Sequence, residues 1–340
     1  MLTAVALALA FHSPVKPTIS VSLIKKLEGL HALGFAPAPT GSKVAVTLEN
    51  NDVRIIDAAT RQTLRTLSGH PQPPYAVAWS KDGTFIATGD ESARIFIWNA
   101  ITGERMKTII GHIRGIQCLS FNTPHTLLAS TGKDDVLNVW NVSNGKKVAE
   151  ILGKGANLYS GTFDPKLDNL LLVGTLSGGA KTYQIGGDGA HVMNFLNPFN
   201  PGGQAHGVLD CSWNPEGTRA VTAANDDLAI LWDMKSFKKI GSFKGHGDWV
   251  VRVQFSPNGK LVATSSSDRT VKVWDTATFE SVATIENEGA VGSPICFTTD
   301  GRFLLTTGVD DNLEFYSVSP SQGSTAPASR APKSKKRRRH

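Results

Sequence analysis

The sequence predicts an all-β fold built from seven repeated units, and three observations lead to this prediction. Runs rich in β-branched and aromatic residues, such as 94–98 and 229–232, alternate with turn formers such as 81–83 and 143–145. No stretch has helical periodicity. An aromatic or large aliphatic residue closes a short apolar strand at steps of 42, 42, 43, 49, 42 and 42 residues, a period typical of stacked units that cannot bury their apolar faces alone. These closing residues are Ile56, Trp98, Trp140, Tyr183, Trp232, Trp274 and Tyr316.

Several units also share a motif, in which a Gly-His pair is followed about thirty residues later by Trp and then Asp or Asn. The pairs are Gly69-His70 with Trp98-Asn99, Gly111-His112 with Trp140-Asn141, and Gly245-His246 with Trp274-Asp275. From about residue 18 to residue 319, the chain resembles the WD40 repeat family. The resemblance implies a seven-bladed WD40 β-propeller with four short antiparallel strands in each repeat.

The two ends of the repeat region predict how the ring closes. The last unit has strands near 293–298, 302–308 and 313–318, after which the composition turns to Ser, Pro and Ala. A fourth strand is therefore missing from that unit. Before the first unit, residues 19–23 alternate apolar and polar. We expect residues 18–28 to pair onto the last blade and complete it, because this arrangement leaves only short protected edges.

One set of polar residues looks like a hydrolase triad with an aromatic neighbour, but it recurs from unit to unit. An active site occurs once per domain, whereas a structural device occurs once per repeat. The family resemblance implies a buried hydrogen-bond chain that links the loop before the inner strand to the second and third strands, where buried indole and imidazole groups need partners. The set comprises His112, Ser130, Asp134 and Trp140; His246, Thr264, Asp268 and Trp274; His70, Thr88 and Trp98; Thr222, Asp226 and Trp232; and Thr306, Asp310 and Tyr316.

The pattern of this set is not kept in every unit. At the aspartate position the second blade has Ser92, the first has Asn50 and the fourth has Ser177. The first, fourth and last blades lack the Gly-His pair. We expect these blades to be held more by apolar packing.

Candidate partner-binding residues lie near the loops that precede the inner strands. Tyr75, Arg114 and Trp249 belong to the residue types that dominate binding hot spots. Phe195 and Phe199 lie in the longest insertion, which accounts for the single step of 49 residues. Loops of this length tend to be functional, although both rings would also serve simply to cover a blade edge.

Positive charge is concentrated in the last residues of the chain. The net charge is +6, but seven basic residues fall between 330 and 339, and without them 28 basic face 29 acidic residues. The ring is therefore close to neutral, and contact with nucleic acid or an anionic surface is expected only through the tail. We expect 320–340 to be a disordered tail whose basic run is a nuclear localisation signal, a tether or only a solubilising segment. The run contains Lys333, Lys335, Lys336, Arg337, Arg338 and Arg339.

The first residues suggest a different destination. Residues 2–11 are apolar apart from Thr3, and 8–10 form a possible small-residue cleavage site. No Lys or Arg precedes this short run. Residues 1–17 are thus either a weak signal-like segment or an extension that lies on the last blade. We expect an intracellular protein, cytoplasmic or nuclear, with export as the alternative, and no transmembrane segment.

The resulting functional prediction is a non-catalytic scaffold that holds a protein or peptide partner of a multiprotein complex on the loop face of the propeller. The alternative is a propeller-type hydrolase with a site at the central channel. Cys118, Cys211 and Cys296 fall in inner-strand segments and lack metal-ligand spacing. We therefore expect no metal and no cofactor.

Overall fold

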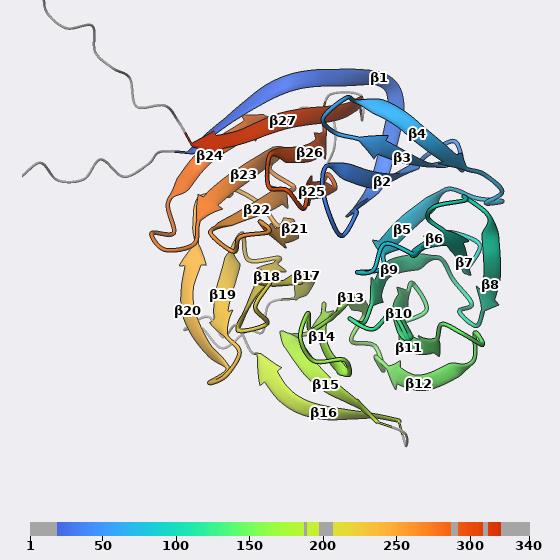
Figure 1. Cartoon of the computed structure of the whole chain (residues 1–340). Helices are drawn as coiled ribbons and strands as arrows, with labels where there is room; N and C mark the ends of the chain where they lie inside the picture. The colour runs from blue at the N-terminus through green and yellow to red at the C-terminus, as the bar shows by residue number, and fades with distance from the viewer. Residues whose placement is uncertain (1–18, 187–188, 197–206, 287–291, 309–311, 321–340) are drawn as a thin grey trace, which may run out of the picture.

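Radial antiparallel sheets form a ring in the computed structural model, which describes residues 19–186, 189–196, 207–286, 292–308 and 312–320 (Figure 1). Five of the blades are separate four-stranded sheets within these described residues. Blade 2 is β5 (Pro74–Trp79), β6 (Phe85–Asp90), β7 (Arg94–Asn99) and β8 (Arg105–Ile110); blade 3 is β9 (Ile116–Phe121), β10 (Leu127–Gly132), β11 (Val136–Asn141) and β12 (Lys147–Leu152); blade 4 is β13 (Leu158–Phe163), β14 (Leu170–Thr175), β15 (Ala180–Gly186) and β16 (Gly189–Leu196); blade 5 is β17 (Val208–Trp213), β18 (Arg219–Ala224), β19 (Ala229–Asp233) and β20 (Lys238–Phe243); blade 6 is β21 (Val250–Phe255), β22 (Leu261–Ser266), β23 (Thr270–Asp275) and β24 (Ser281–Glu286).

Blades 7 and 1 share one strand and form a single seven-stranded sheet. Its order is β25 (Ile295–Phe297), β26 (Phe303–Thr307), β27 (Asn312–Pro320), β1 (Ile19–Pro37), β2 (Lys43–Leu48), β3 (Val53–Asp57) and β4 (Gln62–Leu67). With the five separate sheets, the described residues make seven four-stranded blades. The predicted all-β, seven-bladed propeller is confirmed.

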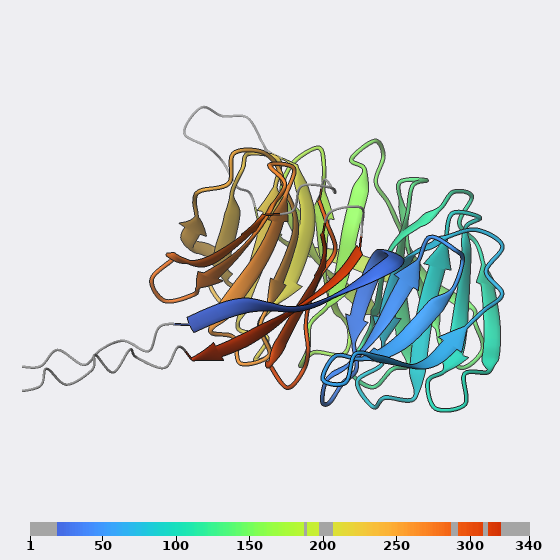
Figure 2. The same ribbon diagram turned by 90° about the horizontal axis from the view of Figure 1, so that it is seen from above.

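The predicted closure by the N-terminal segment is also confirmed. The first part of β1 pairs with β27 from Ile19 opposite Pro320 to His31 opposite Asn312, and the two strands lie side by side in both views (Figures 1 and 2). The structure adds that β1 then continues as the inner strand of blade 1. The register shifts where the strand passes from one blade to the next, and Gly29 there has a φ of +70°, a left-handed conformation that glycine adopts at little cost.

An ion pair between a half-exposed lysine and a buried carboxylate joins the two strands of this closure. Glu314 on β27 is only 2% exposed, and its carboxylate lies 2.6 Å from the Lys26 ammonium on β1. The Tyr316 hydroxyl donates to the other carboxylate oxygen at 2.6 Å. A buried carboxylate is costly unless it is paired and hydrogen-bonded, so β27 depends on β1 to compensate this charge.

The hydrophobic core lies between the blades and not in one central mass. Each of the seven apolar clusters among the described residues draws its members from two neighbouring blades. In the cluster between blades 2 and 3, for example, Trp140 packs with Ile95 and Ile97. Both faces of a blade are therefore covered, which explains why the middle strands read as continuous apolar runs.

Hydrogen bonds between neighbouring inner strands add a second link near the ring axis. Side chains of one blade accept N–H groups of the next, about one repeat further along the chain: Ser120 from Phe163 at 3.0 Å, Ser212 from Phe255 at 3.3 Å, and Gln254 from Phe297 at 2.7 Å. The free edges of the inner strands are thus partly satisfied by the adjacent blade. In the described part of the chain, no helix has the length and apolar character that crossing a bilayer requires.

The closure can be tested by removing the cation that compensates Glu314. We expect Lys26→Ala to lower the free energy of unfolding by about 2 kcal/mol, less than for a fully buried pair because the lysine is half exposed. Urea denaturation measures the change. The matched control is Lys25→Ala, which removes an exposed lysine of the same strand. Equal losses in the two variants would contradict a closure that depends on this pair.

Candidate functional site

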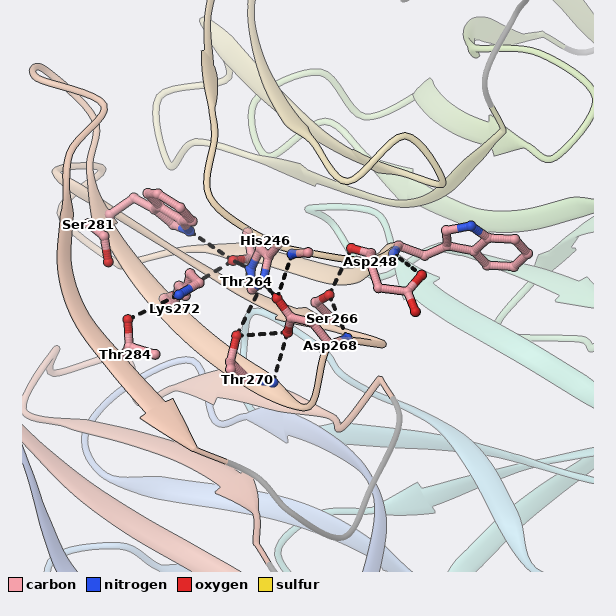
Figure 3. Close-up of polar contacts among 12 residues, drawn as sticks. His246, Asp248, Thr264, Ser266, Asp268, Thr270, Lys272, Ser281 and Thr284 are labelled. Carbon is pink, nitrogen blue, oxygen red and sulfur yellow. Dashed lines mark hydrogen bonds and ion pairs between the residues drawn. The ribbon is translucent and has the colours of Figure 1, made fainter.

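A chain of buried polar contacts runs through blade 6 (Figure 3). The Trp274 indole donates to the Thr264 hydroxyl at 2.8 Å, and that hydroxyl lies 2.7 Å from His246 Nε2. His246 Nδ1 lies 2.8 Å from Asp268, which also accepts the Gly247 N–H at 2.9 Å. One proton arrangement satisfies every contact: Trp274 donates to Thr264, Thr264 to Nε2, and Nδ1–H to the carboxylate.

The charges in this chain follow from its environment. Burial lowers the pKa of His246 and outweighs the opposing effect of Asp268, so the imidazole is neutral near pH 7. Burial alone would raise the pKa of Asp268, but hydrogen bonds from Gly247, Thr270 and His246 outweigh it and lower the pKa to about 2. The chain thus holds a neutral imidazole against a carboxylate that is ionised at neutral pH.

Blade 3 repeats the arrangement with a serine in place of threonine. Trp140 donates to Ser130 at 2.7 Å, and Ser130 lies 2.8 Å from His112 Nε2. His112 Nδ1 lies 3.0 Å from Asp134, which accepts the Ile113 N–H at 2.9 Å. Two blades therefore build the same network from the same repeat positions.

Blade 2 has the complete network as well, although Ser92 stands at the aspartate position of the repeat, so the expectation that this blade is held more by apolar packing is wrong. His70 contacts Thr88 at 2.6 Å and Trp98 donates to Thr88 at 2.7 Å, but the acid is Asp90, 2.8 Å from His70. Asp90 is the last residue of β6, two positions earlier than in the other blades, and the Ser92 hydroxyl donates to it at 2.6 Å. Burial would raise the pKa of Asp90, but hydrogen bonds from His70 and Ser92 lower it. Blade 2 is therefore not held by apolar packing alone.

The network is reduced in the other blades. In blade 5, Trp232 donates to Thr222 at 2.9 Å, and Asp226 follows β18 in the turn. In blade 7, the Tyr316 hydroxyl donates to Glu314, and the Thr306 hydroxyl contacts the Thr307 carbonyl at 3.5 Å. The phenol hydroxyl of Tyr316 lies further from the backbone than an indole N–H would. It therefore bonds to the carboxylate at the end of the Glu314 side chain, on the same strand. Asp310 lies outside the described residues.

The same networks hold the loops that enter the inner strands. We call the surface formed by these loops and by the turns between second and third strands the loop face. Asp134 fixes the backbone of Ile113 and Asp268 that of Gly247. Further along the second loop, the Trp249 carbonyl accepts the Ser267 N–H at 2.8 Å. The repeated polar chains therefore set the geometry of two loops on this face.

The candidate partner-binding residues differ in where the structure places them. Trp249 is 48% exposed on its loop, and Arg114 is exposed on the loop between β8 and β9. Tyr75 is 42% exposed but lies inside β5, one residue past its start, and not in the preceding loop. Phe195 belongs to β16, the outer strand of blade 4, so the insertion begins later than expected. Phe199 lies outside the described residues.

Tyr75 is held in place by charged neighbours. The Lys133 ammonium lies 5.5 Å from the centre of the Tyr75 ring, a cation–π distance, and pairs with Glu91. The backbone N–H of Lys133 donates to the backbone carbonyl of Gly115 at 2.9 Å. Blades 2 and 3 are thus joined at the loop face beside the exposed tyrosine ring.

Three exposed aliphatic residues near the loop face were not among the binding residues predicted from the sequence. Ile113 is 86% exposed beside Arg114, and Ile110 and Leu152 are exposed at the ends of outer strands that lead to this face. An apolar residue directly after a Gly-His pair was the available signal for Ile113. These side chains extend the apolar surface of blades 2 and 3.

A cavity of about 260 Å³ lies in the central channel, lined by all seven inner-strand segments. The acidic residue in the lining of this cavity is Asp210. Its carboxylate accepts hydrogen bonds from the backbone N–H groups of Cys211 at 2.9 Å and Val253 at 3.1 Å. Burial raises the pKa of Asp210, and the nearby Arg252 partly offsets this effect. Asp210 thus contributes to the contact between blades 5 and 6.

The thiols of the channel are poorly suited to nucleophilic chemistry. Burial raises the pKa of Cys118 and Cys211, so both are protonated at neutral pH and lack the thiolate that reacts. All three cysteines are free. Within the described ranges, no group of three or more His, Cys, Asp and Glu side chains is placed to hold a metal ion. The described channel residues therefore give no support to the hydrolase alternative.

The fold and its repeated polar chains define a β-propeller in which the most complete units use a buried Trp, a hydroxyl, a His and an acid. A family model described as "WD domain, G-beta repeat" matches residues 61–99, 103–141, 199–233 and 237–275. The chain therefore contains WD40 repeats at four positions of a seven-bladed propeller. The matched segments end with the third strands that carry the four tryptophans of the repeat, whereas the unmatched blades have Ile or Tyr there. Propellers of this family generally act as protein-interaction scaffolds and are typically non-catalytic.

The acid of blade 2 can be tested by substitution. We expect Asp90→Ala to lower the free energy of unfolding by about 3 kcal/mol, because it leaves the fully buried His70 imidazole without its partner. Ser92→Ala, which removes only a supporting hydroxyl, is expected to cost about 1 kcal/mol. Chemical denaturation of the two variants measures the difference. A larger loss for Ser92→Ala would contradict the assignment of Asp90 as the acid of this network.

The pKa of Asp268 predicts a specific acid sensitivity. Its folded-state pKa of about 2 lies below its ordinary value of 3.8, so its contribution to stability is present above about pH 4 and is lost as the pH falls toward 2. We expect the difference in free energy of unfolding between the native protein and Asp268→Asn to shrink over this range. Urea titrations from pH 5 to pH 2 measure it. A difference that stays constant with pH would show that the carboxylate is not held in its charged form.

Proposed function

We propose that the protein is a non-catalytic scaffold that binds a protein or peptide partner on the loop face, as part of a multiprotein complex. The observation that carries this proposal is the exposure of large residues there: Ile113 at 86%, Trp249 at 48% and Tyr75 at 42%. Aromatic side chains with exposed apolar area are the usual anchors of protein interfaces. Arg114, beside Ile113, adds a charged group suited to hydrogen bonds at the rim.

The rigidity of the loops supports the same proposal. Ile113 and Arg114 follow a backbone held by Asp134, and Trp249 follows one held by Asp268 and Ser267. A loop that is already ordered loses little conformational entropy when a partner binds, so more of the contact energy contributes to affinity. The buried polar chains therefore serve binding indirectly, by pre-organising the residues at the surface.

The basic run at the end of the chain supports a separate proposal about location. We propose that the protein is intracellular and that residues 333–339 direct it to the nucleus or tether it to nucleic acid or an anionic surface. The support is the sequence alone: six Lys and Arg residues in a stretch of seven positions, beside a nearly neutral ring. Export through the apolar N-terminal residues is the competing proposal.

A double substitution tests the loop face. We expect Tyr75→Ala combined with Trp249→Ala to weaken partner binding by about 2 kcal/mol or more, with the melting temperature nearly unchanged because both side chains are half exposed. Quantitative affinity purification followed by mass spectrometry measures retention of partners. The control is Leu64→Ala with Ile240→Ala, which removes side chains of similar exposure, 47% and 42%, from outer strands.

Partners that survive the control but are lost from the loop-face variant support the proposal. Recovery of the same partners by both variants would exclude the loop face. Repeating the purification without residues 320–340 separates partners of the ring from partners of the tail.

A further inference from the structure

The turn between β9 and β10 of blade 3 departs from the repeat, because a histidine there has a backbone conformation that favours glycine. In blades 2, 5, 6 and 7 the turn between the first and second strands has a glycine with positive φ, whose N–H donates to the residue three positions earlier. Blade 3 makes the same hydrogen bond, His125 N–H to Asn122 carbonyl at 3.0 Å, with a histidine at φ +48°. The glycines are Gly83 (+81°), Gly217 (+69°), Gly259 (+67°) and Gly301 (+70°).

A side chain in this left-handed conformation is strained, whereas glycine is not. Strain of this kind persists where the surrounding structure over-determines it, and such a residue is a candidate for a functional role.

The contacts of His125 define its chemistry. Nε2 lies 3.4 Å from the Asp82 carboxylate, and the ring centre lies 6.0 Å from that of Phe85. Because Nε2 faces a carboxylate, we place a ring proton on Nε2, and in that tautomer Nδ1 is an acceptor. Nδ1 is buried and has no hydrogen-bond partner among the residues that the structure describes.

This histidine lines a cavity of about 510 Å³ between blades 2 and 3, on the face opposite the loop face. The wall is mainly apolar, with Phe85, Ile97, Met106 and Val142. A volume of this size suits a small organic molecule. We call it the blade 2–3 pocket.

The other polar side chains of the wall already have partners. The Lys107 ammonium donates to the carbonyl groups of Val142 and Ser143, the Ser143 hydroxyl donates to Asn141, and the Thr126 hydroxyl accepts from Asn122. Among the described wall residues, Nδ1 of His125 is the buried side-chain N or O atom without a hydrogen-bond partner. It is the atom that decides which ligand fits.

We propose that the blade 2–3 pocket binds a small aromatic molecule that carries one N–H or O–H donor, of the indole or phenol class. The ring is buried against the apolar wall and the donor bonds to His125 Nδ1. That nitrogen lies below the cavity surface, so the imidazole turns about its Cβ–Cγ bond to receive the donor and gives up the contact of Nε2 with Asp82. The partly exposed side chain leaves room for this movement. The pocket is independent of partner binding on the loop face.

Two probes of the same shape test the proposal: indole, which has the donor, and benzofuran, in which oxygen replaces the N–H. We expect the native protein to bind indole about tenfold more tightly than benzofuran, the loss of one hydrogen bond. Titrations followed by the methyl NMR signal of Met106, or by calorimetry, measure both affinities. Equal affinity for the two probes, or no binding of indole at millimolar concentration, would overturn the proposal.

The matched variant is His125→Gly, which installs the residue that five other blades have in this turn, since blade 1 has Gly41 there. We expect its melting temperature to stay equal or rise, and its preference for indole over benzofuran to disappear. Met106→Glu, at a half-exposed wall position, is expected to weaken both probes together by placing charge in the apolar wall. A lower melting temperature for His125→Gly with the indole preference retained would assign His125 to packing alone and end the proposal.

Discussion

The ring depends on a single strand that belongs to two blades. Blade 7 has only three strands of its own, and β1 supplies the fourth before it becomes the inner strand of blade 1. Since every apolar cluster of the described residues lies between two neighbouring blades, a ring that opened at this point would expose the facing sides of blades 7 and 1. The buried Glu314, paired with Lys26 across the two strands, makes the closure specific as well as favourable, because this register places Lys26 directly opposite Glu314. Packing supplies the attraction, and the ion pair supplies the alignment.

Local order within the blades follows from the polar chains. A buried indole and a buried imidazole are costly unless paired, and each complete network pairs both with one hydroxyl and one carboxylate. In blades 3 and 6 the carboxylate also takes the backbone N–H of the loop that enters the inner strand, so the core and the loop face share one set of hydrogen bonds. Ile113, Arg114 and Trp249 are displayed on loops whose backbone the interior has already fixed. This connection links the stability of the repeat to the proposed binding surface.

The architecture could be predicted from the sequence because the residue that repeats is also the residue that each blade buries. A tryptophan recurs at 42-residue steps, and its indole is buried where it donates to the polar network of its blade. The closure was readable because a strand was missing at one end and present at the other. Two details were not readable. In blade 2 the acid is at position 90 and not at position 92. A carboxylate at the end of the second strand can contact the imidazole as well as a carboxylate in the following turn can. The start of the long insertion was misplaced because Phe195, in a segment of turn formers, pairs with Lys181 as a strand residue.

Residues that depart from the repeat are the informative ones for function. Where most blades need the same property, the sequence repeats it, as with the turn glycines and the Trp networks. A departure that lowers stability without a structural gain nearby requires a different explanation. Glu314 is explained by closure and Asp210 by the contact between blades 5 and 6. Trp249 and Ile113 expose large side chains on the loop face, and His125 has a backbone conformation that is strained for any residue but glycine. Since the two kinds of departure lie on opposite faces of the same ring, the loop face and the blade 2–3 pocket can be altered separately, and loss of one leaves the other measurable.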